Sequence, residues 1–334
     1  MLARRPLLLI AALMLLPLIW LAVLAWPEPG RPATTELVRL RNALLIEPSA
    51  QQDFDWLPKQ RPTDFLVDST PLPPPMQQWL AALPPQPNDW QQILSLSEHL
   101  RAKGPSGGAL QASTLVSFER ITRDGIGYCA DYIQVINALA QGAGIPVREW
   151  GMSFDGFGGW GHAFSEFYSQ HLDQWVFVDV FNGFYVTLQD SDSPLSVQQL
   201  QQQLHQDPAQ LQIHRLKQGR FGMKSDQVAI DYYLRGKDQF YLWWGTNPLT
   251  FDRHPLISTS AVLSRSAEQM VALLLDIHPR IRVNRPEDNA SMVAQMLSTK
   301  YQLWAITLIE VVLALAFLIF WYRSRKRSPS KGLS

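Results

Sequence analysis

The segment Gly127-Tyr128-Cys129-Ala130-Asp131 decides how this 334-residue chain is interpreted, because it contains the only cysteine. Apolar residues follow it at helical spacing, at Tyr132, Ile133, Val135, Ile136, Leu139 and Ala140. This pattern predicts a helix with Cys129 in its first turn, where unpaired backbone N–H groups and a partial positive charge favour a thiolate. A lone cysteine is also often a small buried apolar residue, so Cys129 alone leaves both interpretations open.

Two later stretches supply the partners that a cysteine nucleophile needs. The segments Gly161-His162-Ala163-Phe164-Ser165-Glu166-Phe167-Tyr168 and Gln174-Trp175-Val176-Phe177-Val178-Asp179-Val180 predict the two strands of a hairpin. At the start of the first strand, His162 can face the N-terminus of a helix packed on the sheet. On the adjacent strand, Asp179 can orient the imidazole and stabilise its cation. Each residue alone has an ordinary structural explanation, so the hypothesis of a catalytic site depends on their combination with Cys129.

Together with Ala143-Gly144-Ile145-Pro146-Val147-Arg148, these segments resemble the transglutaminase-like superfamily, which is related to papain-type cysteine proteases. The family pattern places a cysteine before a helix, then Gly-Ile-Pro-x-Arg, His-Ala-Trp-x-Glu and Trp-x-x-x-Asp. Phe164 replaces the usual tryptophan here, and Val180-Phe181 stands where Pro-Thr often follows the aspartate. The resemblance implies an α+β, papain-like core in which the nucleophile helix packs on an antiparallel sheet.

The resemblance also implies roles for individual residues. Cys129 would be the nucleophile, His162 the acid and base, and Asp179 the group that orients the imidazole. The backbone N–H of Cys129 would contribute to an oxyanion hole. Further candidates for substrate or oxyanion contacts are Tyr128, Trp160 and Glu166, although Glu166 is also interpreted as a structural partner of Arg148. No metal signature or cofactor-binding motif occurs in the sequence, so we predict no metal and no cofactor.

Trp160 belongs to a glycine-rich and aromatic segment, Gly151 to Gly161, that precedes His162. Such a composition is typical of a mobile rim around a groove, and equally of a surface loop held by aromatic packing.

Two apolar segments predict membrane helices at the ends of the chain. Leu7 to Trp26 contains no charged residue, and Leu303 to Tyr322 contains only Glu310. Arg4 and Arg5 precede the first segment, and basic residues from Arg323 follow the second. The positive-inside rule therefore predicts two cytoplasmic ends, with the main domain across the membrane. The resemblance to membrane-anchored bacterial members of the superfamily implies a bacterial inner membrane and a periplasmic main domain. A cleaved signal peptide is the alternative for the first segment, but its length favours an uncleaved anchor.

The predicted organisation has seven parts. They are a cytoplasmic N-terminus at 1–6, a transmembrane helix at 7–26, a helix and proline-rich linker at 27–87, the transglutaminase-like core at 88–190, a helical or mixed extension at 191–302, a second transmembrane helix at 303–322 and a basic cytoplasmic tail at 323–334. The linker is expected to be extended because of its proline content. Residues 209–217 are expected to be helical, and residues 227–234 to form a strand or a strand–helix mixture.

Three classes of function fit these observations. The first is a cysteine enzyme that forms a thioester from a peptide or another amide-bearing envelope substrate, and resolves it with water or with an amine. An arylamine-type acyltransferase is the second, and the Gly-Ile-Pro-x-Arg element and the membrane segments argue against it. The third is a catalytically silent scaffold or binding module that joins envelope proteins. The formal net charge of +0 argues against a nucleic-acid partner.

Overall fold

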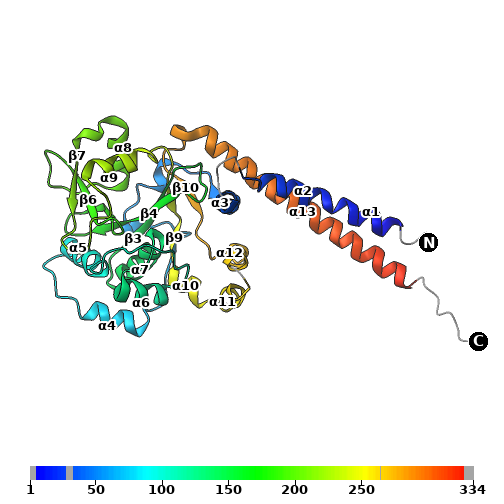
Figure 1. The fold of residues 1–334 in the computed structure, drawn as a ribbon, viewed down its shortest axis with the longest axis horizontal. Coiled ribbons are helices and arrows are strands. Elements are labelled where there is room, and N and C mark those ends of the chain that lie inside the picture. Colours follow the sequence, from blue (N-terminus) through cyan, green and yellow to red (C-terminus); the bar gives the residue numbers. More distant parts are fainter. Residues whose placement is uncertain (1–4, 28–32, 264, 327–334) are drawn as a thin grey trace, which may run out of the picture. The chain divides into compact units, whose positions relative to one another are not determined.

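The computed structural model describes residues 5–27, 33–263 and 265–326. Two compact units make up the chain: Glu47–Ala290, and Met1–Ile46 together with Ser291–Ser334. Figure 1 follows the chain through its helices and strands. The secondary structure confirms the predicted α+β class.

The unit 47–290 is built around a large sheet. Its strand order is β1 (Ile46–Glu47), β10 (Ile281–Val283), β8 (Phe240–Trp243), β3 (Val147–Ser153), β4 (Gly161–Ser169), β5 (Gln174–Asp179), β6 (Phe184–Leu188) and β7 (Leu211–Arg215). From β10 to β7 each neighbouring pair is antiparallel. A separate parallel pair joins β2 (Leu66–Val67) to β9 (Gly245–Thr246). Because β7, β8 and β10 come from 191–302, the predicted extension contributes to the same sheet as the predicted core.

Helices cover both faces of this sheet (Figure 1). The first face packs against α4 (Pro74–Ala81), α5 (Asp89–Leu100), α6 (Thr114–Asp124) and α7 (Cys129–Gly142). The second face packs against α8 (Val197–Gln206) and α9 (Asp226–Leu234). Alternation along the strands divides the apolar side chains between the faces, so that Val176 and Val178 join the first core while Phe177 joins the second. The first core is mainly aliphatic, and the second is rich in aromatic rings.

The helix α7 begins and ends as the sequence predicts. Tyr128 is its N-cap residue, and the backbone N–H of Tyr128 donates to Asp131 Oδ2 at 2.9 Å. At the other end, Gly144 adopts a φ of 75°, in the left-handed region that glycine enters without steric cost. The helix therefore stops before the strand β3, and Cys129 occupies the first position of its first turn.

Three local predictions are wrong. The proline-rich stretch is not wholly extended, because Pro74 and Pro75 start the helix α4. Backbone N–H groups in the first turn of a helix have no acceptor within the helix, so proline, which lacks an N–H, is tolerated there. Residues 209–217 contain the strand β7 instead of a helix, and residues 227–234 are helical within α9. In both cases the segment is short, and its packing against the sheet decides its conformation. The intrinsic helix or strand propensity of its residues is overridden.

The remaining elements of the unit 47–290 lie mostly between β9 and β10. They are α10 (Pro248–Arg253), α11 (Pro255–Ala261) and α12 (Arg265–Leu274), with short 3-10 helices at Gln51–Asp53, Pro58–Gln60, Pro208–Gln210 and Pro286–Asn289.

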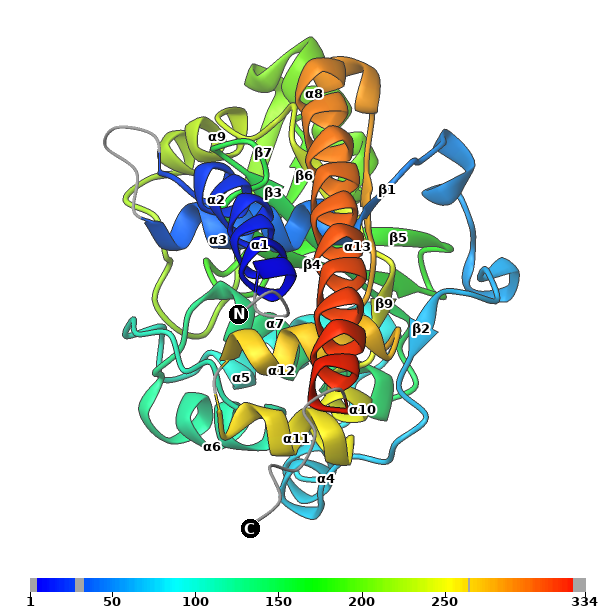
Figure 2. The same ribbon diagram turned by 90° about the vertical axis from the view of Figure 1, so that its right-hand side faces the viewer.

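The other unit consists of α1 (Arg5–Leu13), α2 (Leu15–Leu24), α3 (Ala33–Leu45) and most of α13 (Ala290–Lys326). The spans Pro6–Leu24 and Glu287–Ser324 are long and apolar enough to cross a membrane. Figures 1 and 2 both show α2 and α13 side by side. The break at Met14 has a clear cause, since the Pro17 ring clashes with the carbonyl of Leu13 and lacks a hydrogen-bond donor. Residues 1–4 and 327–334 of the predicted cytoplasmic ends lie outside the described residues.

Candidate active site

Cys129 lies at the N-terminus of α7 and is partly exposed. The His162 side chain and the backbone N–H of Ala163 both act on the Cys129 thiol and lower its pKa. Ala163 is the residue after His162 on β4, so the first residues of one strand supply both contacts. The N-terminal end of a helix adds a partial positive charge at the same point.

His162 joins the thiol to the interior of the protein. Its Nε2 lies 2.8 Å from Asp179 Oδ2, which leaves Nδ1 as the nitrogen for the thiol. Aromatic rings surround the imidazole, namely Phe164, Phe181, Tyr232 and Tyr233, with centroids 5.6 to 6.2 Å away. These rings restrict the imidazole to one orientation and exclude water from its buried side.

Asp179 is fully buried at the end of β5. In the β4–β5 register Ser165 pairs with Val178, so Asp179 lies on the same sheet face as His162. Besides the imidazole, its carboxylate accepts hydrogen bonds from the Asn182 backbone N–H at 2.9 Å, Asn182 Nδ2 at 2.7 Å and the Tyr233 hydroxyl at 2.8 Å. A carboxylate with this many donors stays ionised in the interior.

These contacts move the pKa values of the three groups in complementary directions. Burial acts to raise the pKa of the Cys129 thiol, but the hydrogen bond and charge of His162 outweigh it and lower that pKa. Burial acts to lower the pKa of His162, but the charge and hydrogen bond of Asp179 outweigh it and raise that pKa. The pKa of Asp179 is lowered, because the His162 charge overcomes the effect of burial. The arrangement therefore favours a thiolate–imidazolium pair, the reactive form of a cysteine nucleophile.

The other predicted site residues have different surroundings. Tyr128 and Trp160 are 50% and 52% exposed, and each is close in the chain to a triad residue. The loop that carries Trp160 is held by hydrogen bonds, since Asp155 accepts from the Gly158 and Trp160 N–H groups and Ser153 Oγ accepts from Phe157. The described contacts of this loop favour a surface loop that is held in place over a mobile rim. Both exposed rings remain accessible to a substrate.

Glu166 does not fit the predicted contact with substrate. It is fully buried, and its carboxylate accepts from Arg148, Trp150 Nε1 and the backbone N–H of Val197. Arg148 in turn donates to the Phe54 carbonyl and lies over the Trp175 ring at 4.0 Å. All of these partners are internal, so Glu166 has the structural role that was the alternative interpretation.

Sequence reasoning missed three residues that shape the site. Asn182 follows Asp179 by three residues, the spacing at which a side-chain carboxylate accepts from a backbone N–H in a helix N-cap, and this could have been read from the sequence. Asp131 accepts from Leu110 and Gln111 N–H groups at 3.1 and 3.3 Å, and so attaches the glycine-rich loop 104–111 beside Cys129. Tyr233 comes from α9, far along the chain, and no local signal points to it.

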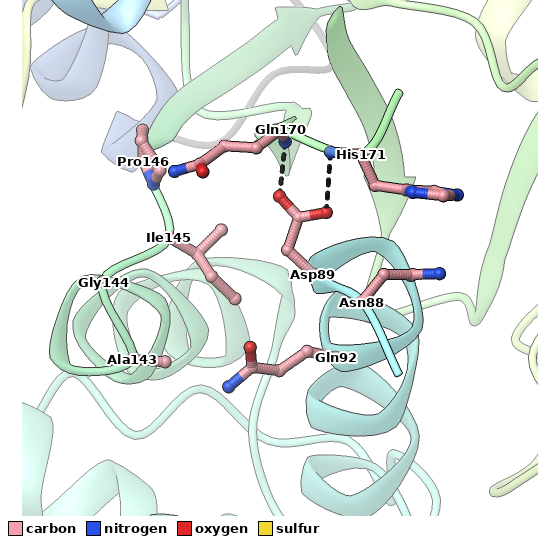
Figure 3. A pocket seen from close by; sticks show the side chains of 9 residues that line it. All are labelled: Asn88, Asp89, Gln92, Ala143, Gly144, Ile145, Pro146, Gln170 and His171. Carbon is pink, nitrogen blue, oxygen red and sulfur yellow. Dashed lines mark hydrogen bonds between the residues drawn. The ribbon is translucent and has the colours of Figure 1, made fainter. Parts of the chain in front are cut away.

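A surface cavity of about 450 Å³ lies elsewhere, between the start of α5, the α7–β3 turn and the β4–β5 turn (Figure 3). Its lining residues are Asn88, Asp89, Gln92, Ala143, Gly144, Ile145, Pro146, Gln170 and His171. Figure 3 shows Asp89 bonded to the backbone N–H groups of Gln170 and His171, so this carboxylate fixes the hairpin turn. The cavity contains none of the three triad residues and is not the candidate active site.

Comparisons of the chain with family models, with curated proteins and with solved structures give no match. Within the described ranges, no group of three or more His, Cys, Asp or Glu side chains could hold a metal ion.

Proposed function

We propose that this chain is a membrane-anchored cysteine enzyme of the transglutaminase-like type, which cleaves or exchanges an amide or ester through a thioester on Cys129. The observation that supports it best is the arrangement of Cys129, His162 and Asp179: His162 Nε2 lies 2.8 Å from Asp179 Oδ2, and His162 lowers the pKa of the Cys129 thiol. A thiol at a helix N-terminus, an imidazole and a buried carboxylate are the groups that this chemistry requires.

The proposed reaction has two stages. The Cys129 thiolate attacks the carbonyl carbon, and the C–N or C–O bond breaks as the imidazolium of His162 gives its proton to the departing amine or alcohol. His162 then removes a proton from water or from an acceptor amine, which attacks the thioester and releases the acid or the new amide. The thiolate and the imidazolium are thereby restored. Water makes the protein a protease or amidase, and an amine makes it a transamidase.

The two apolar helices support a membrane location for this chemistry. Basic residues outside both apolar segments favour cytoplasmic termini and a main domain on the periplasmic side of a bacterial inner membrane. The proposed substrate is therefore a peptide or another amide-bearing component of the cell envelope, and envelope proteins are the proposed partners.

The test uses the full chain in detergent, where Cys129 is the only cysteine and each alkylated molecule reports on the site. The rate of labelling by iodoacetamide is measured by mass spectrometry as a function of pH, beside a His162→Ala variant. We expect rapid labelling well below pH ~8.5, the pKa of an ordinary cysteine, and slower labelling without His162. An ordinary thiol profile that does not change in His162→Ala would contradict the proposed enzyme and favour the scaffold.

The reaction direction needs a second assay. Envelope material is incubated with the protein and a fluorescent primary amine. Incorporation of the amine that disappears in Cys129→Ala supports a transamidase, whereas release of new carboxyl groups without incorporation supports a hydrolase. If Cys129→Ala retains full function in cells, both enzyme interpretations fail.

A further inference from the structure

Arg101 is a fully buried arginine at the C-terminal end of α5, and it contacts Val180, the residue after the triad carboxylate. Its guanidinium donates to the Val180 carbonyl at 3.0 Å, the Gln218 carbonyl at 2.5 Å and the Arg220 carbonyl. Among the described residues, none of these hydrogen bonds goes to a carboxylate. Burying a cation without a carboxylate in contact is costly, which indicates that the charge has another purpose here.

Two glycines allow the guanidinium to occupy this position. Gly183 and Gly219 have φ values of 82° and 79°, in the left-handed region. A Cβ at Gly183 would overlap the guanidinium carbon, and a Cβ at Gly219 would meet Nη1 and the Arg101 carbonyl. The backbone therefore approaches the guanidinium from two segments that are far apart in sequence, and only glycine permits this approach.

The contacts of Arg101 connect the turn after Asp179 to a distant loop. Val180, whose carbonyl Arg101 holds, is the residue next to Asp179. Gly183 N–H donates to the Asp179 carbonyl at 2.7 Å, and Gly222 N–H donates to the Asn182 carbonyl at 2.8 Å. Arg101 thus fixes the backbone from which Asp179 and Asn182 reach the imidazole.

Charge gives Arg101 a second link to the triad. Burial lowers the pKa of Arg101, and the strongest opposing influence is the negative charge of Asp179, followed by Tyr132 and Glu98. Asp179 itself faces His162, Asn182 and Tyr233 in addition to this cation. A fixed positive charge behind the carboxylate offsets part of the negative potential that Asp179 exerts on His162 and Cys129.

We propose that Arg101 is a positioning residue of the Cys129–His162–Asp179 triad, which holds the 179–183 turn and partly offsets the charge of Asp179. This proposal rests on the proposed function, because it assigns Arg101 to the chemistry of Cys129. Asp179 keeps His162 protonated, and the Arg101 cation adds a further positive charge behind the triad. Without that cation less positive charge favours the thiolate, so the thiolate forms at higher pH. A purely structural arginine would change stability without changing that pH.

The test measures the pH midpoint of Cys129 alkylation in the full chain, in three variants. Arg101→Gln removes the charge, and we expect its midpoint to rise by about 0.5–1 pH unit. Arg101→Lys keeps the charge but loses the planar fork, so the midpoint should stay within about 0.2 pH unit while stability falls. Arg282→Gln is the control, because Arg282 pairs with Asp53 and Asp64, and none of its contacts within the described ranges involves the triad. Its midpoint should not move.

The outcomes separate this proposal from the proposed function. A low midpoint in the unmodified chain that is unchanged in folded Arg101→Gln overturns the role of Arg101 alone, as does an equal rise in Arg282→Gln. An ordinary thiol profile in the unmodified chain overturns both proposals. If Arg101→Gln does not fold, Gly219→Ala on the exposed loop displaces the guanidinium instead. We expect a smaller rise in the same direction, and an unchanged midpoint in that variant overturns the proposal.

Discussion

Two buried carboxylates on one face of the sheet, Asp179 and Glu166, each bind a cation, but only one pair is suited to chemistry. Both carboxylates are fully buried, and the nitrogen–oxygen distances are 2.8 Å for His162–Asp179 and 2.5 Å for Arg148–Glu166. Glu166 binds an arginine, which keeps its charge at any pH that proteins experience. Asp179 binds a histidine, which gains and loses a proton readily and has a thiol as its second neighbour.

Burial and pairing alone therefore do not identify a carboxylate that could serve a reaction. The Arg148–Glu166 pair is enclosed by Trp150, Trp56 and Trp175, and all its bonds end inside the protein. The Asp179–His162 pair ends at a partly exposed sulfur. A titratable partner with a route to solvent therefore separates a site that can react from a pair that only stabilises. The comparison makes four predictions, in order of decreasing effect.

The largest effect is expected from breaking the structural pair. Glu166→Leu leaves the Arg148 cation buried without its carboxylate, and should lower the free energy of unfolding by about 3–5 kcal/mol. Unfolding of the full chain in detergent measures the change. The double variant Arg148→Met with Glu166→Leu should recover most of the loss, because no charge remains buried. Equal instability of the single and double variants would contradict this account.

Asp179→Asn should instead act on reactivity. The amide keeps the size of the side chain but removes the charge that holds His162 protonated, so fewer molecules carry the thiolate. We expect alkylation of Cys129 at pH 7 to slow at least ~10-fold, which corresponds to about 1.4 kcal/mol. Glu166→Gln is the matched amide variant, and its folded fraction should label at the normal rate. Equal slowing in both variants would remove the distinction between the pairs.

A smaller effect is expected from the pH dependence of stability. The pKa of Asp179 is lowered by folding, so its contribution is present above the unfolded value of ~3.9 and is lost as pH falls through the folded value. The pKa of His162 is raised, so its contribution is complete below ~6.5 and is lost as pH rises through the folded value. The stability difference between the unmodified chain and Asp179→Asn should therefore be largest between about pH 4 and 6.5.

The structural pair provides the contrast for that measurement. Arg148 does not lose its proton. The difference in unfolding free energy between the unmodified chain and Glu166→Gln should therefore not decline between about pH 6.5 and 9. If the stability differences for Asp179→Asn and Glu166→Gln both declined over this pH range, the loss of stability would not be specific to His162.

The smallest effect is expected for Tyr233→Phe. This change removes one of the four hydrogen bonds to Asp179 and should cost about 0.5–1.5 kcal/mol in unfolding free energy. Tyr185→Phe is the control, because the Tyr185 hydroxyl makes no hydrogen bond among the described residues. If the two variants lose equal stability, the Tyr233 hydroxyl contributes nothing to holding Asp179.

Local pattern predicted much of the candidate site. The helix opening at Cys129 and the two strands that carry His162 and Asp179 follow from periodicity and turn residues, and their bounds agree with α7, β4 and β5. The catalytic role of the three residues stays a prediction. Local pattern failed at α4, β7 and α9, where a short segment has no strong preference and its neighbours decide its conformation.

By itself, the sequence determined the α+β class, the apolar end segments and the order of thiol, imidazole and carboxylate, because each is written in local spacing or composition. Only the tertiary structure decided which partners these groups meet. Tyr233 lies 54 residues after Asp179, and Arg101 lies 79 residues before Val180, so no local pattern joins them. Their contacts arise from strand register and from the packing of α5 and α9, which depend on the whole fold and on no single segment.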